Sequence, residues 1–314
     1  MEKKKILITD QVHPILIEKL VEAEYDVDFK PGFQYKKLAS VIGEYAGIII
    51  NSKIKMTPQL MDLANQLQFI GRLGSGLDII DLEYAKEKDI DVISTPEGNR
   101  NAVSEHALGM LLSLANNLHR SDQQVRNKIW KREENRGFEI KDKVIGIVGL
   151  GNTGRSFAEK LSCWAHRILF YDKYLLESPK GMSNIERVRL EYLQEYSDII
   201  SLHLPLTHET EHFVDNNFIN KCKPGFVLIN TSRGKVVDTN AIIQGMKTRL
   251  IGGLCLDVFE NEKPDLYDEN ERVIYDTLFD FENAVFTPHV AGWSNESLEQ
   301  IALVMAEKII HRNY

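Results

Sequence analysis

Residues 143–154 read KVIGIVGLGNTG, in which a run of β-branched residues leads directly into a complete Gly-x-Gly-x-x-Gly motif. A buried strand, a tight glycine turn and a helix together aim backbone N–H groups at a pyrophosphate, and Gly151 lets the main chain approach the ligand closely. The motif lies near the middle of the 314-residue chain. A dinucleotide-binding unit that opens at this point must follow another unit, so the sequence predicts two.

The strand predicted after this motif ends on an acidic residue. Residues 167–172 read RILFYD, and Asp172 lies 18 positions after Gly154, near the roughly 20 positions expected for a carboxylate that hydrogen-bonds the adenosine ribose. Such a carboxylate repels a 2′-phosphate, so the sequence favours NAD over NADP, although the adjacent Lys173 would weaken that preference. The alternative is a glycine-rich turn without a ligand, which the strand, the helix and Asp172 together disfavour.

The composition is that of a globular protein, with 43% hydrophobic residues and a net charge of −8. This length suffices for two domains with their own cores. The acidic balance, without a basic arm at either end, argues against nucleic acid or an anionic membrane as the main partner. No apolar stretch reaches transmembrane length, and the polar start MEKKK lacks the apolar core of a signal peptide.

The cysteines bear on the cellular compartment. Cys163, Cys222 and Cys255 are isolated from one another in the sequence. Isolated cysteines in odd number fit a reducing compartment, so we expect a cytoplasmic protein. Each of the three is expected to be a small buried hydrophobic side chain.

Short β-branched runs alternate with amphipathic stretches along the chain. The first part predicts strands at 6–9, 27–29, 47–51, 69–71 and 91–93, with helices at 14–23, 57–64 and 82–88. A long helical segment at 101–119 and a charged stretch at 130–136 follow, and strands resume at 145–149, 168–172, 199–203, 226–230, 252–256 and 285–287. This alternation predicts two doubly wound parallel-sheet α/β domains, the second with six strands. A last helix at 294–312 is expected to return and pack on the first domain.

Three polar residues each follow a predicted strand of the second domain. They are Arg233, Glu262 and His289. Taken singly, a loop arginine, a surface glutamate and a structural histidine are all common. Because the carboxyl ends of parallel strands share one edge of a sheet, the three side chains can converge beside a nicotinamide, where they would suit the reduction of a carbonyl.

The sequence resembles the D-isomer-specific 2-hydroxyacid dehydrogenases over nearly its whole length. The matching motifs are GRLGSGLD at 71–78, TPEGN at 95–99 with AVSE at 102–105, GLGNTG at 149–154, HLPLT at 203–207, NTSRG at 230–234, LDVF at 256–259 and TPHVAG at 287–292. The resemblance implies a Rossmann NAD domain at 98–287, inserted in a discontinuous flavodoxin-like substrate domain formed by 1–97 plus 288–314. It also implies an active site in the cleft between the domains, with hinge closure over the substrate.

The resemblance also implies a role for each catalytic residue. Arg233 would clamp the substrate carboxylate and polarise its carbonyl. His289 would act as general acid in reduction and general base in oxidation, while Glu262 would hold it and favour its protonated form. The reaction would be hydride transfer between NAD and C2 of a D-2-hydroxy or 2-keto acid.

Further binding residues follow by position from the same resemblance. Substrate contacts are expected at Asn51, Gly74, Ser75, Gly76 and Arg233. NAD contacts are expected at Ser75, Gly149, Gly151, Asn152, Thr153, Gly154, Asp172, Leu204, Thr231, Ser232, Arg233, Asp257, His289 and Gly292. A homodimer through the helix at 101–119 and the arm around Trp130 is also implied, no metal is expected, and the C-terminal regulatory domain of many phosphoglycerate dehydrogenases is expected to be absent.

The chain departs from the family pattern near Glu262. The usual Glu-Pro reads Glu262-Lys263-Pro264 here, which makes Glu260 a rival for the role of Glu262. The acidic stretch at 265–282 is longer than expected and would either cover the cleft or form plain surface. Trp293 would either shape the pocket or lie in the core.

The residues expected to bind the substrate do not identify which acid it is. Phosphoglycerate enzymes often carry an arginine where this chain has Asn51. A substrate phosphate would then need Lys53, Arg72, Lys131 or Arg132, each of which is more commonly a surface or structural charge.

Parts of the sequence also match two other classes of function. His208-Glu209-Thr210-Glu211-His212 matches the zinc-hydrolase pattern His-Glu-x-x-His, but Pro205 places it at the entry to a helix and no third ligand follows at a recognisable spacing. An NAD-responsive binding module, like the related C-terminal-binding-protein corepressors, would retain the same residues; the absence of long disordered tails favours an enzyme. Formate dehydrogenase is disfavoured, because that chemistry pairs its histidine with a glutamine.

Overall fold

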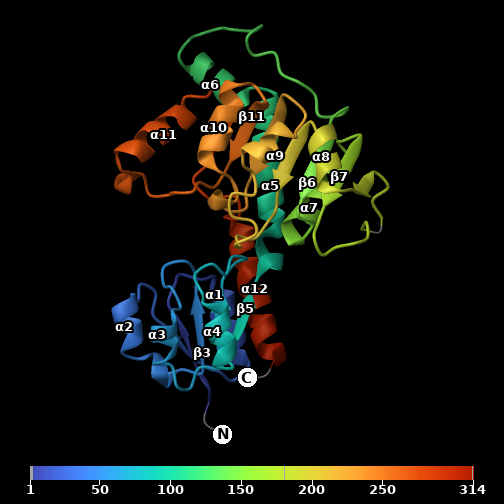
Figure 1. Ribbon diagram of the computed structural model, residues 1–314. Helices are drawn as coiled ribbons and strands as arrows, with labels where there is room; N and C mark the ends of the chain where they lie inside the picture. The colour runs from blue at the N-terminus through green and yellow to red at the C-terminus, as the bar shows by residue number, and fades with distance from the viewer. Residues whose placement is uncertain (1–2, 180, 313) are drawn as a thin grey trace. The chain divides into compact units, whose positions relative to one another are not determined.

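The computed structural model describes residues 3–179, 181–312 and 314. The chain divides into two compact units: unit 1 comprises Met1–Arg100 with Trp293–Tyr314, and unit 2 comprises Asn101–Gly292 (Figure 1). Each unit is built on its own parallel β-sheet. The prediction of two parallel-sheet α/β domains, one inserted in the other, is confirmed.

Unit 1 has the five-stranded order β2-β1-β3-β4-β5, which is the flavodoxin-like order. Its strands are β1 Lys5–Ile8, β2 Asp26–Phe29, β3 Gly47–Ile50, β4 Phe69–Arg72 and β5 Asp91–Ser94. Its helices before residue 96 are α1 Pro14–Glu22, α2 Tyr35–Ala39, η1 Ile42–Glu44, α3 Pro58–Met61 and α4 Leu82–Glu87. One face of the sheet is covered by α2, α3 and α4, and the other by α1 together with the last helix of the chain.

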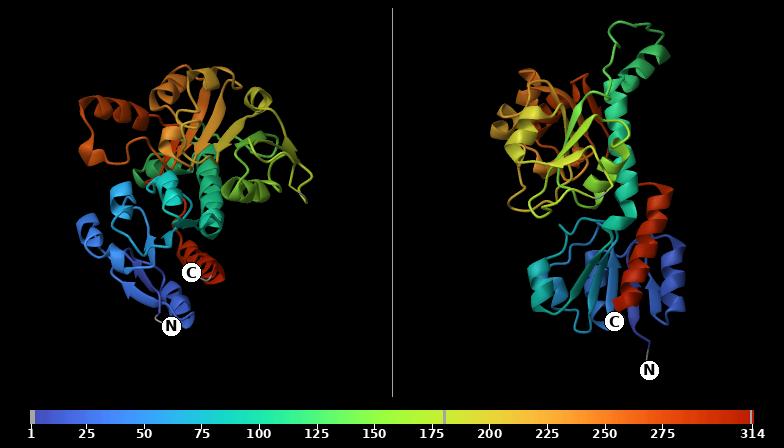
Figure 2. Two further views of the ribbon diagram at one scale, coloured as in Figure 1. Left: turned by 60° about the horizontal axis from the view of Figure 1, so that its bottom comes forward. Right: turned by 90° about the vertical axis from the view of Figure 1, so that its right-hand side faces the viewer.

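The last helix, α12 Asn295–Arg312, packs on unit 1 beside α1 (Figure 2). It begins at a reciprocal cap in which the N–H groups of Ser294 and Ser297 donate to each other's hydroxyl oxygens at 2.9 and 3.0 Å. Met305 and Ile309 are fully buried in the same cluster as Ile6 of β1. The prediction that this helix returns to the first domain is therefore confirmed.

Unit 2 has the seven-stranded order β12-β11-β10-β9-β6-β7-β8, and every neighbouring pair is parallel. Its strands are β6 Val144–Val148, β7 Arg167–Tyr171, β8 Ile185–Arg187, β9 Ile199–Leu202, β10 Phe226–Asn230, β11 Ile251–Leu256 and β12 Ala284–Phe286. The strand order reverses between β6 and β9, where such sheets bind ligands outside the carboxyl ends of their strands.

Helices cover both faces of this sheet. On one face lie α8 Leu190–Tyr196, α9 Asn216–Asn220, α10 Thr239–Lys247 and α11 Glu269–Phe279, and on the other lie α5 Pro96–Ala115 and α7 Asn152–Leu161. The remaining elements are α6 Leu118–Arg126, η2 Gly234–Val236 and η3 Pro264–Leu266. None of the helices in the described ranges has the length and apolarity needed to cross a bilayer.

Several elements differ from the prediction. The seventh strand, β8, was not predicted, because it has three residues of which only Ile185 is buried, too few for an alternating pattern. The helix expected at 101–119 begins at Pro96 and ends at Ala115, and Asn117 adopts a left-handed φ of 51° that separates it from α6.

The burial of side chains decides between alternatives or corrects the expectation at three further places. The acidic stretch at 265–282 contains the helix α11, which buries Tyr275 and Leu278 in the core of unit 2. Trp293 is 78% exposed, so it is not a core residue. Cys163 is exposed whereas Cys222 and Cys255 are buried, so the expectation of three buried thiols is wrong for Cys163.

Candidate active site

The glycine turn after β6 combines close packing with open space. Gly149 has a φ of +89°, and a Cβ atom there would lie 2.5 Å from the carbonyl oxygen of His203. A Cβ atom on Gly154 would lie 2.1 Å from the carbonyl oxygen of Gly149. A Cβ atom on Gly151 would meet nothing within 4 Å in the described chain, and Gly151 caps the N-terminus of α7. Two glycines therefore bring strand and helix together, and the third leaves room for a phosphate.

Asp172 at the end of β7 is tied to the glycine turn. Its Oδ2 accepts from the Leu150 N–H at 2.8 Å, and its Oδ1 accepts from the N–H groups of Tyr174 and Leu175 at 2.8 and 2.9 Å. Burial raises the pKa of this carboxyl, but the three backbone hydrogen bonds outweigh burial, so the pKa lies below its ordinary value. The group is an oriented carboxylate at the position where a ribose is expected.

A buried histidine, His203, contacts the glycine turn, and the sequence analysis did not predict this role. His203 Nδ1 lies 3.2 Å from Thr153 Oγ1, and its Nε2 lies 3.0 Å from Ser201 Oγ. Burial lowers the pKa of His203 to about 3, so the ring is neutral. The hydroxyl of Thr153, expected to contact NAD, is thus engaged by His203. The sequence signal for this residue is a histidine at the end of the strand predicted at 199–203, where the motif HLPLT begins.

The loop after β10 is organised by Asn230. Its Oδ1 accepts from both the N–H and the hydroxyl of Ser232, at 3.0 and 2.7 Å, and its Nδ2 donates to the Arg233 carbonyl at 2.9 Å. Thr231 is buried, and no hydrogen-bond partner for its hydroxyl lies in the described parts of the chain. A buried hydroxyl without a partner is uncommon and suits a site that a ligand completes. This orphaned group and the open space at Gly151 fit a bound NAD.

The three predicted catalytic residues follow adjacent strands, β10, β11 and β12. His289 Nδ1 and Glu262 Oε2 lie 2.8 Å apart. A Cβ atom on Gly234 would lie 1.9 Å from the carbonyl oxygen of Phe259, so the loop after Arg233 runs directly against the loop that leads to Glu262. Arg233 Nη1 donates to the Ser232 carbonyl at 2.7 Å.

The electrostatics of Glu262 reflect this pairing. Burial raises the pKa of its carboxyl, but the hydrogen bond and charge of His289, the Phe259 N–H and the Arg233 guanidinium together hold that pKa below its ordinary value. The carboxylate is therefore ionised at neutral pH and can hold the ring of His289 through Nδ1. That leaves Nε2 of His289 for proton exchange.

Asp257, expected to contact NAD, is fully buried behind the His289 loop. Its carboxylate accepts from the Thr287 hydroxyl at 2.6 Å and from the N–H groups of Val290 and Ala291 at 2.8 and 2.9 Å. Its carbonyl accepts from the His289 N–H at 2.7 Å. In this structure the residue shapes the loop that presents His289.

The rival glutamate, Glu260, faces other partners. Its Oε1 accepts from the N–H and hydroxyl of Thr239 at 2.8 and 2.7 Å, and its Oε2 lies 2.8 Å from His212 Nε2. This hydrogen bond raises the pKa of His212. Residues 208–212 form turns, so the helix start expected there is wrong, and α9 begins at Asn216. Across the ranges that the structure describes, no three His, Cys, Asp or Glu side chains group as metal ligands.

The predicted substrate residues of unit 1 lie at the carboxyl ends of its strands. Gly74 has a φ of +117° and donates its N–H to Thr95 Oγ1 at 2.7 Å, while Arg72 Nη1 donates to the Leu73 carbonyl at 2.6 Å. Asn51 donates its N–H to the buried Asp10 carboxylate at 3.0 Å.

The other predicted binding residues lie in loops or, for Asn152, at the start of a helix. Lys53 Nζ lies 3.7 Å from Asp10 Oδ1. Ser75 and Gly76 follow Gly74 in the same loop, Asn152 is the first residue of α7, Leu204 packs near Gly149, and Gly292 is the last residue of unit 2.

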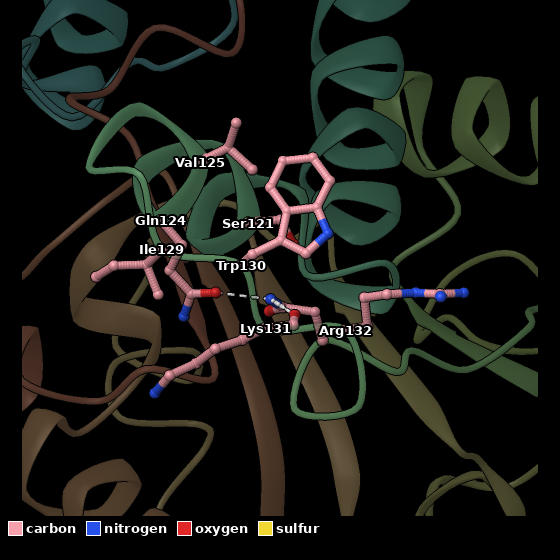
Figure 3. Close-up of a pocket in the computed structure, with 8 residues that line it drawn as sticks. Ser121, Gln124, Val125, Ile129, Trp130, Lys131 and Arg132 are labelled. Carbon is pink, nitrogen blue, oxygen red and sulfur yellow. Dashed lines mark hydrogen bonds between the residues drawn. The ribbon is translucent and has the colours of Figure 1, made fainter.

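A separate cavity lies between α6 and the segment that follows it (Figure 3). It is lined by Ser121, Gln124, Val125, Ile129, Trp130, Lys131, Arg132 and Asn135. Asn135 Nδ2 donates to Gln124 Oε1 at 2.7 Å and stabilises the segment. The ring of Trp130 is 78% exposed. None of the predicted catalytic residues lines this cavity.

Comparison with known proteins identifies what the chain resembles. Residues 108–291 match the family model described as D-isomer specific 2-hydroxyacid dehydrogenase, NAD binding domain. The D-3-phosphoglycerate dehydrogenase of Synechocystis sp. is 32% identical over 305 residues, which cover 97% of this chain and 53% of that protein. The chain thus spans about half the length of the phosphoglycerate dehydrogenases it matches.

Two further matches cover most of both chains. The hydroxypyruvate reductase of Thermotoga maritima is 33% identical over 273 residues, which cover 87% of this chain and 86% of that protein. The structure of a D-lactate dehydrogenase from Aquifex aeolicus, complexed with NAD and lactic acid, has a TM-score of 0.84 and 28% identity, covering 97% of this chain and 94% of that one.

Proposed function

Because the chain belongs to the D-isomer-specific 2-hydroxyacid dehydrogenase family, we propose that it transfers a hydride between NAD and C2 of a D-2-hydroxy acid or 2-keto acid. The observation that carries this proposal is the pair formed by His289 and Glu262, 2.8 Å apart. Glu262 follows β11 and His289 follows β12, and β11 lies between β12 and β10, the strand that leads to Arg233. The arginine can bind an anion, the histidine can transfer a proton, and the carboxylate can orient the histidine.

The proposed mechanism assigns one task to each of these side chains. Arg233 binds the substrate carboxylate with its planar set of donors and polarises the keto oxygen. His289 donates a proton from Nε2 to that oxygen during reduction, and Glu262 keeps the ring oriented by accepting from Nδ1. Bound NADH supplies the hydride. In oxidation His289 takes the proton back, with Glu262 still bonded to Nδ1.

The residues proposed to hold NAD lie around the switch point of the unit 2 sheet. The open turn at Gly151 would receive the pyrophosphate, with the N-terminus of α7 behind it. Asp172 would accept from the adenosine ribose, and the hydroxyl of Thr231, which has no hydrogen-bond partner among the described residues, would bond to the cofactor. The carboxylate of Asp172 supports the preference for NAD over NADP.

We propose that unit 1 is the substrate domain and that the chain works as a homodimer in the cytoplasm. The two buried thiols, Cys222 and Cys255, support a reducing compartment. The dimer is supported by the large apolar side chains of Val125, Ile129 and Trp130, which stand exposed at the cavity of Figure 3, and by Leu118, which is exposed at the start of α6. An exposed apolar patch of this kind is typical of a surface that a second chain covers.

A substrate panel tests the proposed function. NADH oxidation is measured with hydroxypyruvate, glyoxylate, pyruvate, branched 2-keto acids and phosphohydroxypyruvate, and the highest kcat/KM identifies the acid. His289→Ala is the control and should lower kcat by about 100-fold or more while NADH binding is retained. Tight NADH binding without turnover of any acid would instead support the corepressor-like binding module.

A further inference from the structure

The loop between β11 and η3 is tied to α11 through Asn261. The Asn261 N–H donates to Tyr275 Oη at 2.8 Å, and its carbonyl accepts from Tyr267 Oη at 3.0 Å. Its Nδ2 donates to Glu271 Oε1 at 2.8 Å, and its Oδ1 accepts from the Lys263 N–H at 3.0 Å. Both backbone groups and both side-chain groups of Asn261 are therefore engaged, three of them by residues 267–275.

The partners of Asn261 are themselves well held. Tyr267 and Tyr275 stack with their ring centroids 4.5 Å apart, and Tyr275 is 4% exposed. Glu271 belongs to the capping box at the start of α11, where its second carboxylate oxygen accepts from the Asp268 N–H at 3.1 Å. One carboxylate thus joins the first turn of α11 to the loop.

Asn261 stands between two glutamates that have different tasks. Glu260 is bonded to Thr239 and His212, whereas Glu262 is bonded to His289. A slip of the loop would carry Glu262 away from His289 and would move the neighbouring carboxylate as well. Asn261 lies between the two glutamates, and its hydrogen bonds oppose such a slip.

We propose that Asn261 is a positioning residue, which fixes the register of this loop so that Glu262 faces His289. Its effect on turnover rests on the proposed function, whereas its effect on the contact between Glu262 and His289 does not. Through this loop, α11 contributes to the position of Glu262. The helix holds the loop through Tyr275 and Glu271, and the loop holds the proton donor through Glu262.

The first test removes the side chain of Asn261. Asn261→Ala loses the bonds to Glu271 and to the Lys263 N–H, and kcat should fall by about 3- to 10-fold, the range expected for losing such bonds. The KM for NADH should stay within about twofold of the wild-type value, because Asn261 is not among the residues proposed to bind NAD. Asn184→Ala is the matched control, since Asn184 is also half-buried and donates two bonds, to the carbonyls of Ser162 and Ala165 at 3.0 Å each. Its kcat should not change.

A rescue experiment separates positioning from general damage. Asn261→Asp places a second carboxylate against Glu271 and should lower kcat further than Asn261→Ala, because like charges repel. In the double variant N261D/E271Q the donor and the acceptor are exchanged, and the new amide still offers an oxygen to the Asp268 N–H. Its kcat should recover above that of Asn261→Ala. No recovery would overturn the role of the bond between Asn261 and Glu271.

The pH profile gives a readout that a loss of folded protein does not. His289, Arg233 and Tyr267 are the charged or titratable groups that act on Glu262. If Asn261→Ala weakens the hydrogen bond between Glu262 and His289, the contact that lowers the pKa of Glu262 is weakened while burial still raises that pKa. The pKa of Glu262 should then rise, so the acid limb of kcat/KM should move to higher pH. A variant that merely lost folded enzyme would lower activity equally at every pH, with the limb unmoved.

Ring-nitrogen NMR of enzyme with 15N-labelled histidine follows the Nδ1 of His289 without turnover. We expect the hydrogen-bonded Nδ1 signal to be altered in Asn261→Ala and retained in Asn184→Ala. An unaltered signal together with an unmoved acid limb would overturn the proposal. If the wild-type enzyme reduced no 2-keto acid, the proposed function would fail, and the NMR comparison would still decide whether Asn261 positions Glu262.

Discussion

At the scale of single residues, the backbone of His289 is the notable feature of the site. Its φ of +54° lies in the left-handed region that residues other than glycine rarely adopt. Such a conformation costs on the order of 1–3 kcal/mol and persists only where neighbours enforce it. Asp257 does so, because its carbonyl bonds to the His289 N–H and its carboxylate bonds to the next two N–H groups. Asp257 thereby holds the loop that presents His289, the proposed proton donor.

The pairing of Glu262 also predicts how stability depends on pH. Its pKa in the folded protein lies below the ordinary value of 4.5, so its contribution to stability is present above that value and is lost as the pH falls through the folded pKa. Glu262→Gln should therefore be less stable than wild type at neutral pH, and the difference should vanish at lower pH. Urea unfolding of both proteins between about pH 3 and about pH 7 measures this.

The control for that comparison is Glu260→Gln. Glu260 also has a lowered pKa, which burial raises and the bonds from Thr239 and His212 lower more strongly. It should show a similar loss of stability while its kcat stays close to that of wild type. A kcat for Glu262→Gln equal to that of Glu260→Gln would contradict the distinct roles assigned to the two glutamates.

At the scale of elements, α11 depends on its first turn. Asp268 accepts from the Glu271 N–H at 2.8 Å, and Glu271 accepts from the Asp268 N–H in return. Asp268→Ala should lower the free energy of unfolding by about 1 kcal/mol, as expected for the loss of an N-terminal cap. Denaturant unfolding checks this, with Asp265→Ala in η3 as the control. Equal stability of the two variants would mean that the capping box contributes nothing measurable.

The elements also show why some predictions succeeded. The strand predicted at 226–230 has the same bounds as β10, Phe226–Asn230. All five residues are buried, and the first four form a continuous apolar run. In α11 only Tyr275 and Leu278 are buried, so its sequence carries too weak an apolar stripe to predict a helix. β8 was missed for the similar reason that two of its three residues are exposed.

At the scale of the whole molecule, the exposed apolar residues around Trp130 predict how the protein assembles. Trp130→Glu should convert the proposed dimer to a monomer, because a charge would have to be buried in the interface. Light scattering measures the mass. Trp293→Ala is the matched control, since both tryptophan side chains are 78% exposed, and it should remain a dimer. A wild-type protein that is monomeric would contradict the proposal outright.

The sequence by itself determined the two parallel α/β units and the place of the dinucleotide turn at Gly149–Gly154, while the insertion of one unit in the other was implied by the family resemblance. These features depend on local patterns, namely β-branched runs, helical periodicity and glycines at fixed spacing. The same patterns placed Arg233, Glu262 and His289 after neighbouring strands, and their roles stay predictions until variants are measured.

Only the tertiary structure decided which contacts these residues make. That Glu262 rather than Glu260 faces His289, that Asp257 lies buried behind the His289 loop, and that His203 supports Thr153 depend on partners 27 to 50 positions apart along the chain. Hydrogen bonds act over about 3 Å, and their partners come together only when the strands pair and the helices pack. The stretch at 265–282 shows the same point. Its acidic sequence was expected either to cover the cleft or to form plain surface, yet Tyr275 packs in the core and its hydroxyl accepts from the Asn261 N–H in the loop between β11 and η3.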